Sequence, residues 1–197
     1  MVGNSVNDLK LAVYSDASFA GDTGCSKSTT GGVLCLVGDK TFVPLNWICK
    51  KQGAVSHSST EAEIIALDAV LRVEGVPCLN LWSDNVECIH PVKRIFRKAE
   101  TRNESAYGRY DLISFEYMDW VPPSLPPLRD NGVQLVFVED NDAVLKMCVK
   151  ARYPNLKYCP RTHRVDLDWL FLLIKTDPCV VGRYIHTKLQ IADLLRA

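Results

Sequence analysis

The sequence predicts an α/β fold in which a mixed sheet carries helices on its faces. Three observations point to this class: three apolar runs with turn residues between them, a long apolar helix after these runs, and alternating strand and helix patterns in the second half of the chain. The 197 residues suit one domain, and 47% of them are hydrophobic while 23% are charged, which is ordinary for a globular protein.

The first third of the chain predicts three strands in succession. We expect them at residues 9–19, 32–37 and 41–49, with glycine and polar residues at 21–30 in the first connection. Strands joined by connections this short pair antiparallel, because a parallel pair needs a long crossover.

A helix with a broad apolar face is expected next. A serine or threonine of residues 58–60 can cap it, and the carboxylates of Glu61 and Glu63 in its first turn suit the helix dipole. Gly75 and Pro77 are expected to interrupt this helical pattern.

Regular patterns return near residue 133. They predict, in order, a strand at 133–140, helices at 142–150 and about 162–175, a strand at 180–185 and a short helix at 191–196. Residues 83–132 contain a proline-rich run that suits neither a helix nor a central strand. We therefore expect a single domain at 9–197 in which 83–132 is a partly mobile surface insertion.

Four acidic residues stand at positions that packing does not explain. Asp16 and Asp140 each end an apolar strand-like run, Glu63 lies at the start of the apolar helix, and Asp193 lies on the short terminal helix. Converging carboxylates repel each other unless cations hold them, and Mg²⁺ or Mn²⁺ suits an all-carboxylate site. Two such ions about 3.5–4 Å apart support phosphodiester cleavage.

Each of these acids also has an ordinary structural interpretation. Asp16 fits a turn residue at a strand end, Glu63 a helix-dipole acid, Asp140 a helix N-cap, and Asp193 a surface acid.

The composition of the chain limits which nucleic-acid and membrane partners are expected. The formal net charge is zero, so a nucleic-acid site must be a local basic patch. No apolar run approaches the roughly 20 residues that span a bilayer, and residues 1–10 lack a signal-peptide core. We expect no membrane partner and an intracellular, cytoplasmic protein that is not secreted.

The eight cysteines are irregularly spaced and form no CxxC motif. Most lie in apolar stretches, which predicts reduced core thiols and no disulfide-linked partner. A zinc site of Cys148, Cys159 and His163 is the alternative, although its spacing matches no finger pattern.

The sequences around the four acids resemble the RNase H domain of copia-type retrotransposon Pol polyproteins. The matching motifs are YSDASFAGD (14–22), KSTTGG (27–32), KKQ (50–52), SSTEAE (58–63), EDN (139–141), THRVD (162–166) and TKLQIADLL (187–195). The resemblance covers roughly residues 9–82 and 133–197. It implies a ribonuclease H-like mixed sheet of five strands, three antiparallel and then parallel, flanked by helices.

The resemblance also implies an endoribonuclease that hydrolyses the RNA strand of RNA–DNA hybrids during reverse transcription. Asp16, Glu63, Asp140 and Asp193 would be the catalytic metal ligands, holding two Mg²⁺ ions that Mn²⁺ can replace. The apolar-alanine step after Glu63 favours it over Glu61 as the ligand. The expected partner is the reverse transcriptase domain of the same element, in cis or in trans, and a virus-like particle is a further expected location.

Substrate contacts are expected near the strand ends. Hydroxyl, amide and cationic side chains there suit the 2′-hydroxyls and phosphates of a hybrid. The candidates are Ser15, Ser18, Thr60, Asn141, Lys50, Lys51, His163 and Arg164. For His163, a role in capping or orienting its helix is the alternative.

A second functional hypothesis is a catalytically weak or inactive retroelement remnant that acts only as a nucleic-acid-binding module. The long proline-rich stretch and the few residues after Asp193 depart from the family pattern and favour it. The presence of all four acids favours the nuclease.

Overall fold

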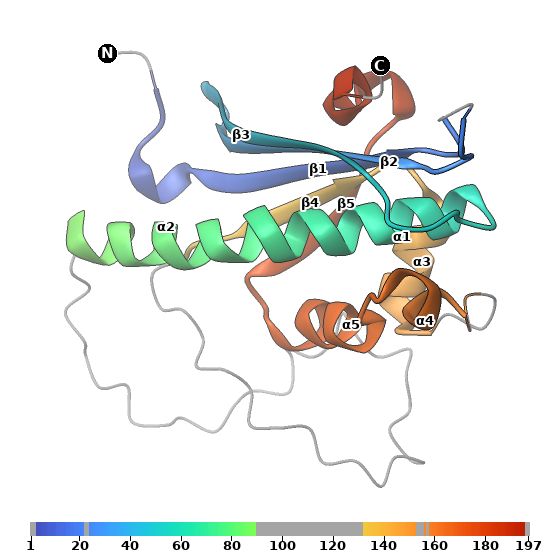
Figure 1. Cartoon of the computed structure of the whole chain (residues 1–197). Coiled ribbons are helices and arrows are strands. Elements are labelled where there is room, and N and C mark those ends of the chain that lie inside the picture. The colour runs from blue at the N-terminus through green and yellow to red at the C-terminus, as the bar shows by residue number, and fades with distance from the viewer. Residues whose placement is uncertain (1–2, 22–23, 90–131, 153–155, 157, 196–197) are drawn as a thin grey trace, which may run out of the picture.

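A five-stranded mixed sheet forms the centre of the molecule. The computed structural model describes residues 3–21, 24–89, 132–152, 156 and 158–195. The strand order is β3-β2-β1-β4-β5 (Figure 1). The first three strands pair antiparallel, and β4 and β5 extend the sheet in parallel, which confirms the predicted fold class.

The strands lie close to their predicted positions. They are β1 (Lys10–Ser18), β2 (Thr29–Gly38), β3 (Thr41–Lys51), β4 (Leu135–Glu139) and β5 (Val180–Tyr184). Strands β1 and β2 contain the buried apolar residues that the sequence predicted, such as Leu11 to Val13 and Leu34 to Cys35. Strand β3 is an edge strand, and most of its residues are exposed.

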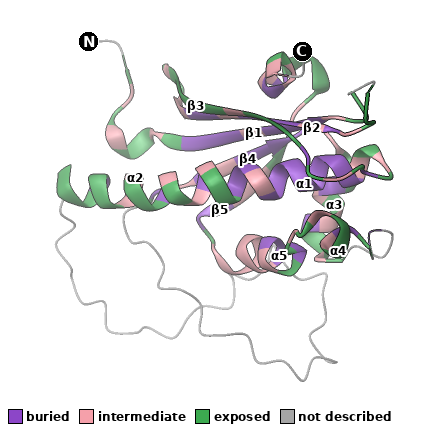
Figure 2. Ribbon diagram, viewed as in Figure 1, coloured by how far each residue is buried: buried purple, intermediate pink, exposed green. Residues whose placement is uncertain are grey.

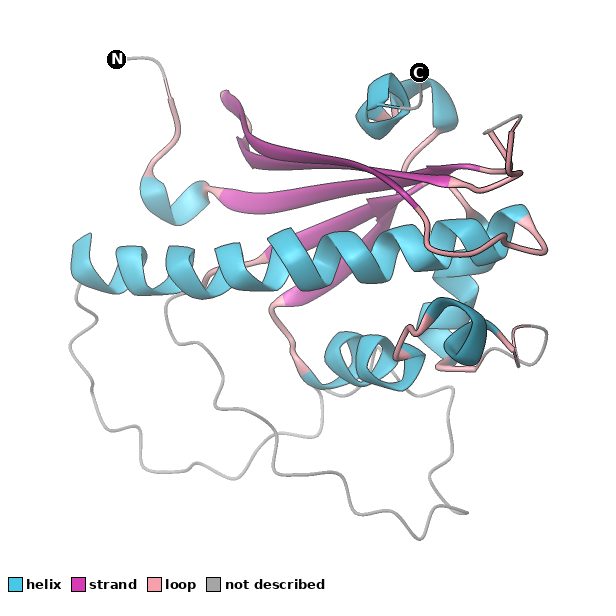
Figure 3. Ribbon diagram, in the orientation of Figure 1, coloured by secondary structure: helices cyan, strands magenta, loops and turns pink. Residues whose placement is uncertain are grey.

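Helices pack mainly on one face of the sheet. The helices are α1 (Ser59–Val70), α2 (Val76–Ile89), α3 (Asp142–Lys150), α4 (Cys159–His163) and α5 (Leu167–Thr176), with short 3-10 helices η1 (Val6–Asp8), η4 (Thr187–Leu189) and η5 (Ile191–Leu195) (Figure 3). Helix α1 packs on β1 and β2, while η5 contacts the same strands from the opposite side of the sheet (Figure 1). Among the described residues, no helix combines the length and apolar character needed to cross a bilayer.

The hydrophobic core lies between the sheet and its helices (Figure 2). Leu11 and Val13 of β1, Phe137 of β4 and Leu67 of α1 are almost fully buried in it. The buried residues of the strands and the broad apolar face of α1 therefore meet in one layer.

The predicted interruption at Gly75 and Pro77 is wrong. Helix α1 continues through a five-residue π-helical turn, η2 (Leu71–Gly75), directly into α2. There the Val76 N–H donates to Leu71 O, and this wider turn accommodates a proline that has no N–H of its own. The helix therefore runs through residues 83–89, and the rest of the expected insertion, 90–131, lies outside the described residues.

The single helix predicted at about 162–175 is also wrong, because the structure divides it. Arg164 adopts a left-handed conformation (φ 56°) that ends α4. Asp166 then starts α5, accepting a 3.0 Å hydrogen bond from Trp169 N at its Oδ1. Local capping thus overrode an apolar pattern that continued across the break.

Helix α1 approaches β2 closely at Gly32, where a Cβ would lie 2.4 Å from Val70 Cγ2. We expect Gly32→Ala to destabilise the protein by about 1–3 kcal/mol, since helix and strand must separate. Gly53→Ala is the matched control, because a Cβ there meets nothing within 4 Å. Urea unfolding measures both variants, and equal midpoints would contradict the close packing.

Candidate metal centre

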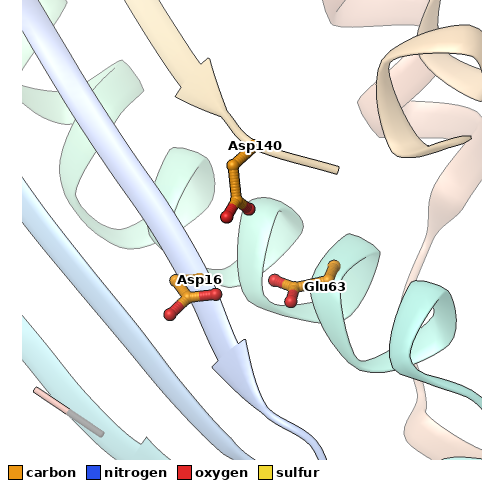
Figure 4. A group of neighbouring side chains, drawn as sticks. All are labelled: Asp16, Glu63 and Asp140. Atoms are coloured by element: carbon orange, nitrogen blue, oxygen red, sulfur yellow. The ribbon is translucent and has the colours of Figure 1, made fainter. Parts of the chain in front are cut away.

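Three of the four predicted acids converge at one end of the sheet. Asp16 comes from β1, Glu63 from α1 and Asp140 from the residue after β4 (Figure 4). One carboxylate oxygen from each lies within 4.8 Å of the other two. Asp16 and Glu63 are buried and Asp140 is partly buried. We call Asp16, Glu63 and Asp140 the acidic triad.

Parallel pairing of β1 with β4 brings two of these acids together. The paired register ends at Tyr14 and Val138, so each strand places its acid two residues beyond the last pair. Asp16 is fully buried rather than in an exposed turn. The N-cap of α3 is Asn141, so Asp140 does not serve as the cap.

The start of α1 is held in place by Gln52. Its Nε2 donates to Ala62 O at 2.9 Å and to Thr30 Oγ1 at 3.2 Å, and its Oε1 accepts from Ser56 Oγ at 3.0 Å. Ser58 caps the helix by accepting from Glu61 N at 3.1 Å. These bonds fix the turn that carries Glu63 against β2.

The charge environment of Glu63 favours a cation. Burial raises its pKa to about 9, with the negative charges of Glu139, Asp140 and Asp193 adding to the effect, while the Ala17 N–H opposes it. Glu63 Oε2 is buried and has no hydrogen-bond partner among the described residues. A set of carboxylate oxygens with such an atom fits a hard divalent ion such as Mg²⁺ or Mn²⁺.

Asp193 lies on η5, beside the acidic triad but outside it. Its charge acts on Glu63, and burial raises its own pKa. The Gln190 Nε2 donates to Ser15 O at 2.9 Å, which anchors η5 to β1. Gly31 permits the close approach, because a Cβ there would lie 3.1 Å from Ala192 O.

Glu61 and Glu63 point to different surroundings. Glu61 Oε2 accepts from His57 N at 2.7 Å, and its Oε1 lies 3.6 Å from His163 Nε2. Only Glu63 belongs to the acidic triad.

A fifth carboxyl, Glu139, was missed by the sequence reasoning. It is fully buried, accepts from Ser15 Oγ at 3.0 Å and from Asn141 N at 3.3 Å, and burial raises its pKa to about 8. The strand alternation was the available signal, because it puts Glu139 on the same side of β4 as the core residues Leu135 and Phe137.

Three predicted substrate residues have side chains engaged by other parts of the chain. Ser15 is fully buried and its hydroxyl donates to Glu139. Asn141 Oδ1 caps α3 by accepting from two backbone N–H groups. The His163 side chain is 2% exposed and lies against Glu61, which agrees with its alternative role in orienting α4. Burial lowers the pKa of His163.

The other predicted substrate residues lie at accessible positions. Ser18 ends β1 and Thr60 lies in the first turn of α1, both partly exposed. Lys50 and Lys51 are exposed on β3, in register through β2 with the end of β1. Arg164 is exposed after α4.

The zinc alternative has no geometric counterpart. Among the described residues, the acidic triad is the group whose ligand atoms meet, and Cys148, Cys159 and His163 form no such group.

Proteins with similar sequences include retrotransposon polyproteins. The chain is 47% and 46% identical, over 57 residues, to the retrovirus-related Pol polyproteins from transposons RE2 and RE1 of Arabidopsis thaliana. It is 45% identical over 58 residues to the secreted RxLR effector protein 161 of Plasmopara viticola. No family model matches the chain. The resemblance seen in the motifs is thereby confirmed.

These matches are partial. Each covers 29% of this chain, but only 4% of either polyprotein and 38% of the effector protein. The activity of the whole relatives therefore does not transfer directly.

Two solved structures align over most of the chain. LC11-RNase H1, isolated from compost, has a TM-score of 0.46 at 12% identity and covers 94% of this chain and 91% of its own. RNase H1 from Halobacterium salinarum NRC-1 has a TM-score of 0.45 at 13% identity, with 94% and 93% covered. The strand order and the acidic triad of this chain carry the structural argument.

Proposed function

We propose that this chain is a metal-dependent endoribonuclease that hydrolyses the RNA strand of RNA–DNA hybrids during retrotransposon reverse transcription. The observation that carries the proposal is the acidic triad, whose oxygens lie within 4.8 Å of one another. The sequence similarity to Pol polyproteins supports the choice of nucleic acid as the substrate.

The chain's own residues supply a binding site for cations rather than a nucleophile. Asp16, Glu63 and Asp140 would hold the first divalent ion, and Asp193 on η5 would complete the site for a second. When bound, two Mg²⁺ ions, or Mn²⁺ in their place, lower the pKa of the attacking water and stabilise the departing 3′ oxygen. The products would carry a 5′-phosphate and a 3′-hydroxyl.

Substrate choice would come from residues around the acidic triad. Ser18 and Thr60 are partly exposed beside it and suit contacts to the RNA 2′-hydroxyls. Lys50, Lys51 and Arg164 are exposed cations suited to phosphates. With a net charge of zero, these three cations are the only electrostatic attraction we invoke.

The partner in this proposal is the reverse transcriptase domain of the same element, in cis or in trans. The setting is intracellular, in the cytoplasm or a virus-like particle. Similarity to segments of Pol polyproteins supports the first of these statements.

A labelled RNA–DNA hybrid tests the activity. With Mg²⁺ or Mn²⁺, the wild-type protein is expected to cleave the RNA strand and to leave the DNA strand and a matched DNA duplex intact. EDTA and the Asp140→Asn substitution should each remove the cleavage, because both empty the site of its ion. Gel electrophoresis of both end-labelled strands gives the readout.

Two outcomes would contradict the proposal. Equal cleavage by wild type and Asp140→Asn would identify a contaminating nuclease. Hybrid binding by the wild type without any cleavage would instead support the remnant that only binds nucleic acid.

A further inference from the structure

Glu139 occupies the point where backbone pairing between β1 and β4 stops. The parallel register runs from Leu11 with Leu135 to Tyr14 with Val138 and goes no further. The next residues along the two strands, Ser15 and Glu139, are joined by a side-chain hydrogen bond instead, 3.0 Å from Ser15 Oγ to Glu139 Oε2. Beyond this bond the strands open toward the acidic triad.

The Glu139 carboxyl connects the neighbours of two proposed metal ligands. Ser15 directly precedes Asp16, and Asn141 directly follows Asp140. One Glu139 oxygen accepts from Ser15 Oγ, and the other accepts from the Asn141 N–H at 3.3 Å. One side chain thus links the backbone segments that carry both aspartates.

The main chain around this link is held from other directions. Ile185 N donates to Glu139 O at 3.1 Å, and Gln190 Nε2 donates to Ser15 O at 2.9 Å. Both strand ends are therefore held by the segments that follow β5 and precede η5, and the Ser15–Glu139 bond joins the two ends to each other.

The Glu139 carboxyl also accepts from the Asp140 N–H, so it holds the backbone of one proposed ligand. Its exposed fraction and that of Ser15 are both 0%, and Glu139 is not a member of the acidic triad. Glu139 therefore acts on bound ions through the ligands, by the positions of Asp16 and Asp140 and by its charge beside Glu63.

We propose that Glu139 is a positioning residue that sets the separation of Asp16 and Asp140 through its hydrogen bonds to Ser15 and Asn141. The inference rests on the proposed function, because it concerns the metal affinity of the same site. Residues that orient metal ligands typically change metal affinity by about 10–100-fold when they are replaced.

Mn²⁺ affinity of the full chain tests this role, with electron paramagnetic resonance of free Mn²⁺ as the readout. Ser15→Ala removes the hydroxyl donor, and Glu139→Gln places an amide where one of two accepting oxygens stood. Each is expected to weaken Mn²⁺ binding about tenfold. The double variant should bind Mn²⁺ no more weakly than the more impaired single variant, since both substitutions break the same Ser15–Glu139 hydrogen bond.

Thr176→Val is the matched control. This substitution also removes a partly buried hydroxyl donor, because Thr176 Oγ1 donates to Leu172 O at 2.8 Å. The lost bond lies at the end of α5. The Thr176→Val variant should keep the wild-type Mn²⁺ affinity, and Ser15→Thr, which restores the hydroxyl, should recover most of the affinity lost in Ser15→Ala. Thermal midpoints in EDTA show whether each variant is folded.

The outcomes separate this inference from the proposed function. Wild-type Mn²⁺ affinity in Ser15→Ala, with or without a lowered thermal midpoint, would overturn the positioning role even if Glu139→Gln does not fold. If the wild-type protein binds Mn²⁺ and cleaves hybrids while the variants keep the wild-type Mn²⁺ affinity, only the positioning role is overturned. If the wild-type protein binds no Mn²⁺, both the positioning role and the proposed function are overturned.

Discussion

Glu63→Gln is expected to lower hybrid cleavage about a thousandfold or more, whereas Glu61→Gln lowers it less than about tenfold. A metal ligand supports several kcal/mol of transition-state stabilisation, and about 4 kcal/mol corresponds to a thousandfold in rate. Glu63 belongs to the acidic triad, whereas Glu61 accepts from the His57 N–H, a bond that a glutamine oxygen also accepts.

The pair is well matched for this comparison. Both residues are buried, both lie in the first turns of α1, and both substitutions keep the side-chain shape. Single-turnover cleavage in Mg²⁺, with circular dichroism to verify folding, decides between them. A larger loss in Glu61→Gln would move the ligand assignment to Glu61.

Without divalent ions, the protein is expected to lose stability as the pH rises from about 7 to about 8.5. Burial raises the pKa of Glu63 to about 9 and that of Glu139 to about 8, both from an ordinary value of 4.5. The folded state therefore holds protons that the unfolded state has released. The stabilisation is complete below the unfolded pKa and is lost as the pH rises through the folded pKa.

The titration of His163 changes the stability in the opposite direction, and it does so at lower pH. Burial lowers its pKa from 6.5, so its contribution is lost as the pH falls below that value. Comparison above pH 7 therefore separates the effect of the acids from that of His163.

Thermal midpoints in EDTA and in Mn²⁺ measure this dependence. Mn²⁺ should raise the midpoint, and more so at about pH 8.5 than at about pH 7, because metal binding requires deprotonated carboxylates. Glu63→Gln should flatten the pH dependence in EDTA and remove most of the Mn²⁺ effect. A midpoint that is independent of both pH and Mn²⁺ would contradict the metal site.

Much of the fold was predictable because the relevant signals are local. Helix α3 begins and ends where the pattern placed it, at Asp142–Lys150, since an Asn cap and an apolar face lie within one short segment. The first strand and its acid were recognisable for the same reason. The π-helical turn at Leu71–Gly75 was not, because its surroundings come from distant strands: a Cβ at Gly75 would lie 3.2 Å from Leu135 Cδ2 and 3.4 Å from Val13 Cγ2.

The acids were predictable as candidates, but their arrangement was not. The sequence pattern marked Asp16, Glu63, Asp140 and Asp193, and it distinguished Glu63 from Glu61. It gave Ser15 and Asn141 to the substrate, whereas the structure directs one to Glu139 and the other to the N-terminus of α3.

The amino-acid sequence by itself determined the element types, the five-stranded α/β class and the chemical character of the site, since periodicity, caps and strand-end acids are properties of short segments. Tertiary structure alone decided which carboxyls meet and which are enclosed. The reason is the register of β1 against β4, which ends at Tyr14 and Val138, so that Glu139 is buried opposite Ser15 and the carboxylates of Asp16 and Asp140 lie within 4.8 Å of each other. Such a register joins residues more than 120 positions apart, and no local pattern contains it.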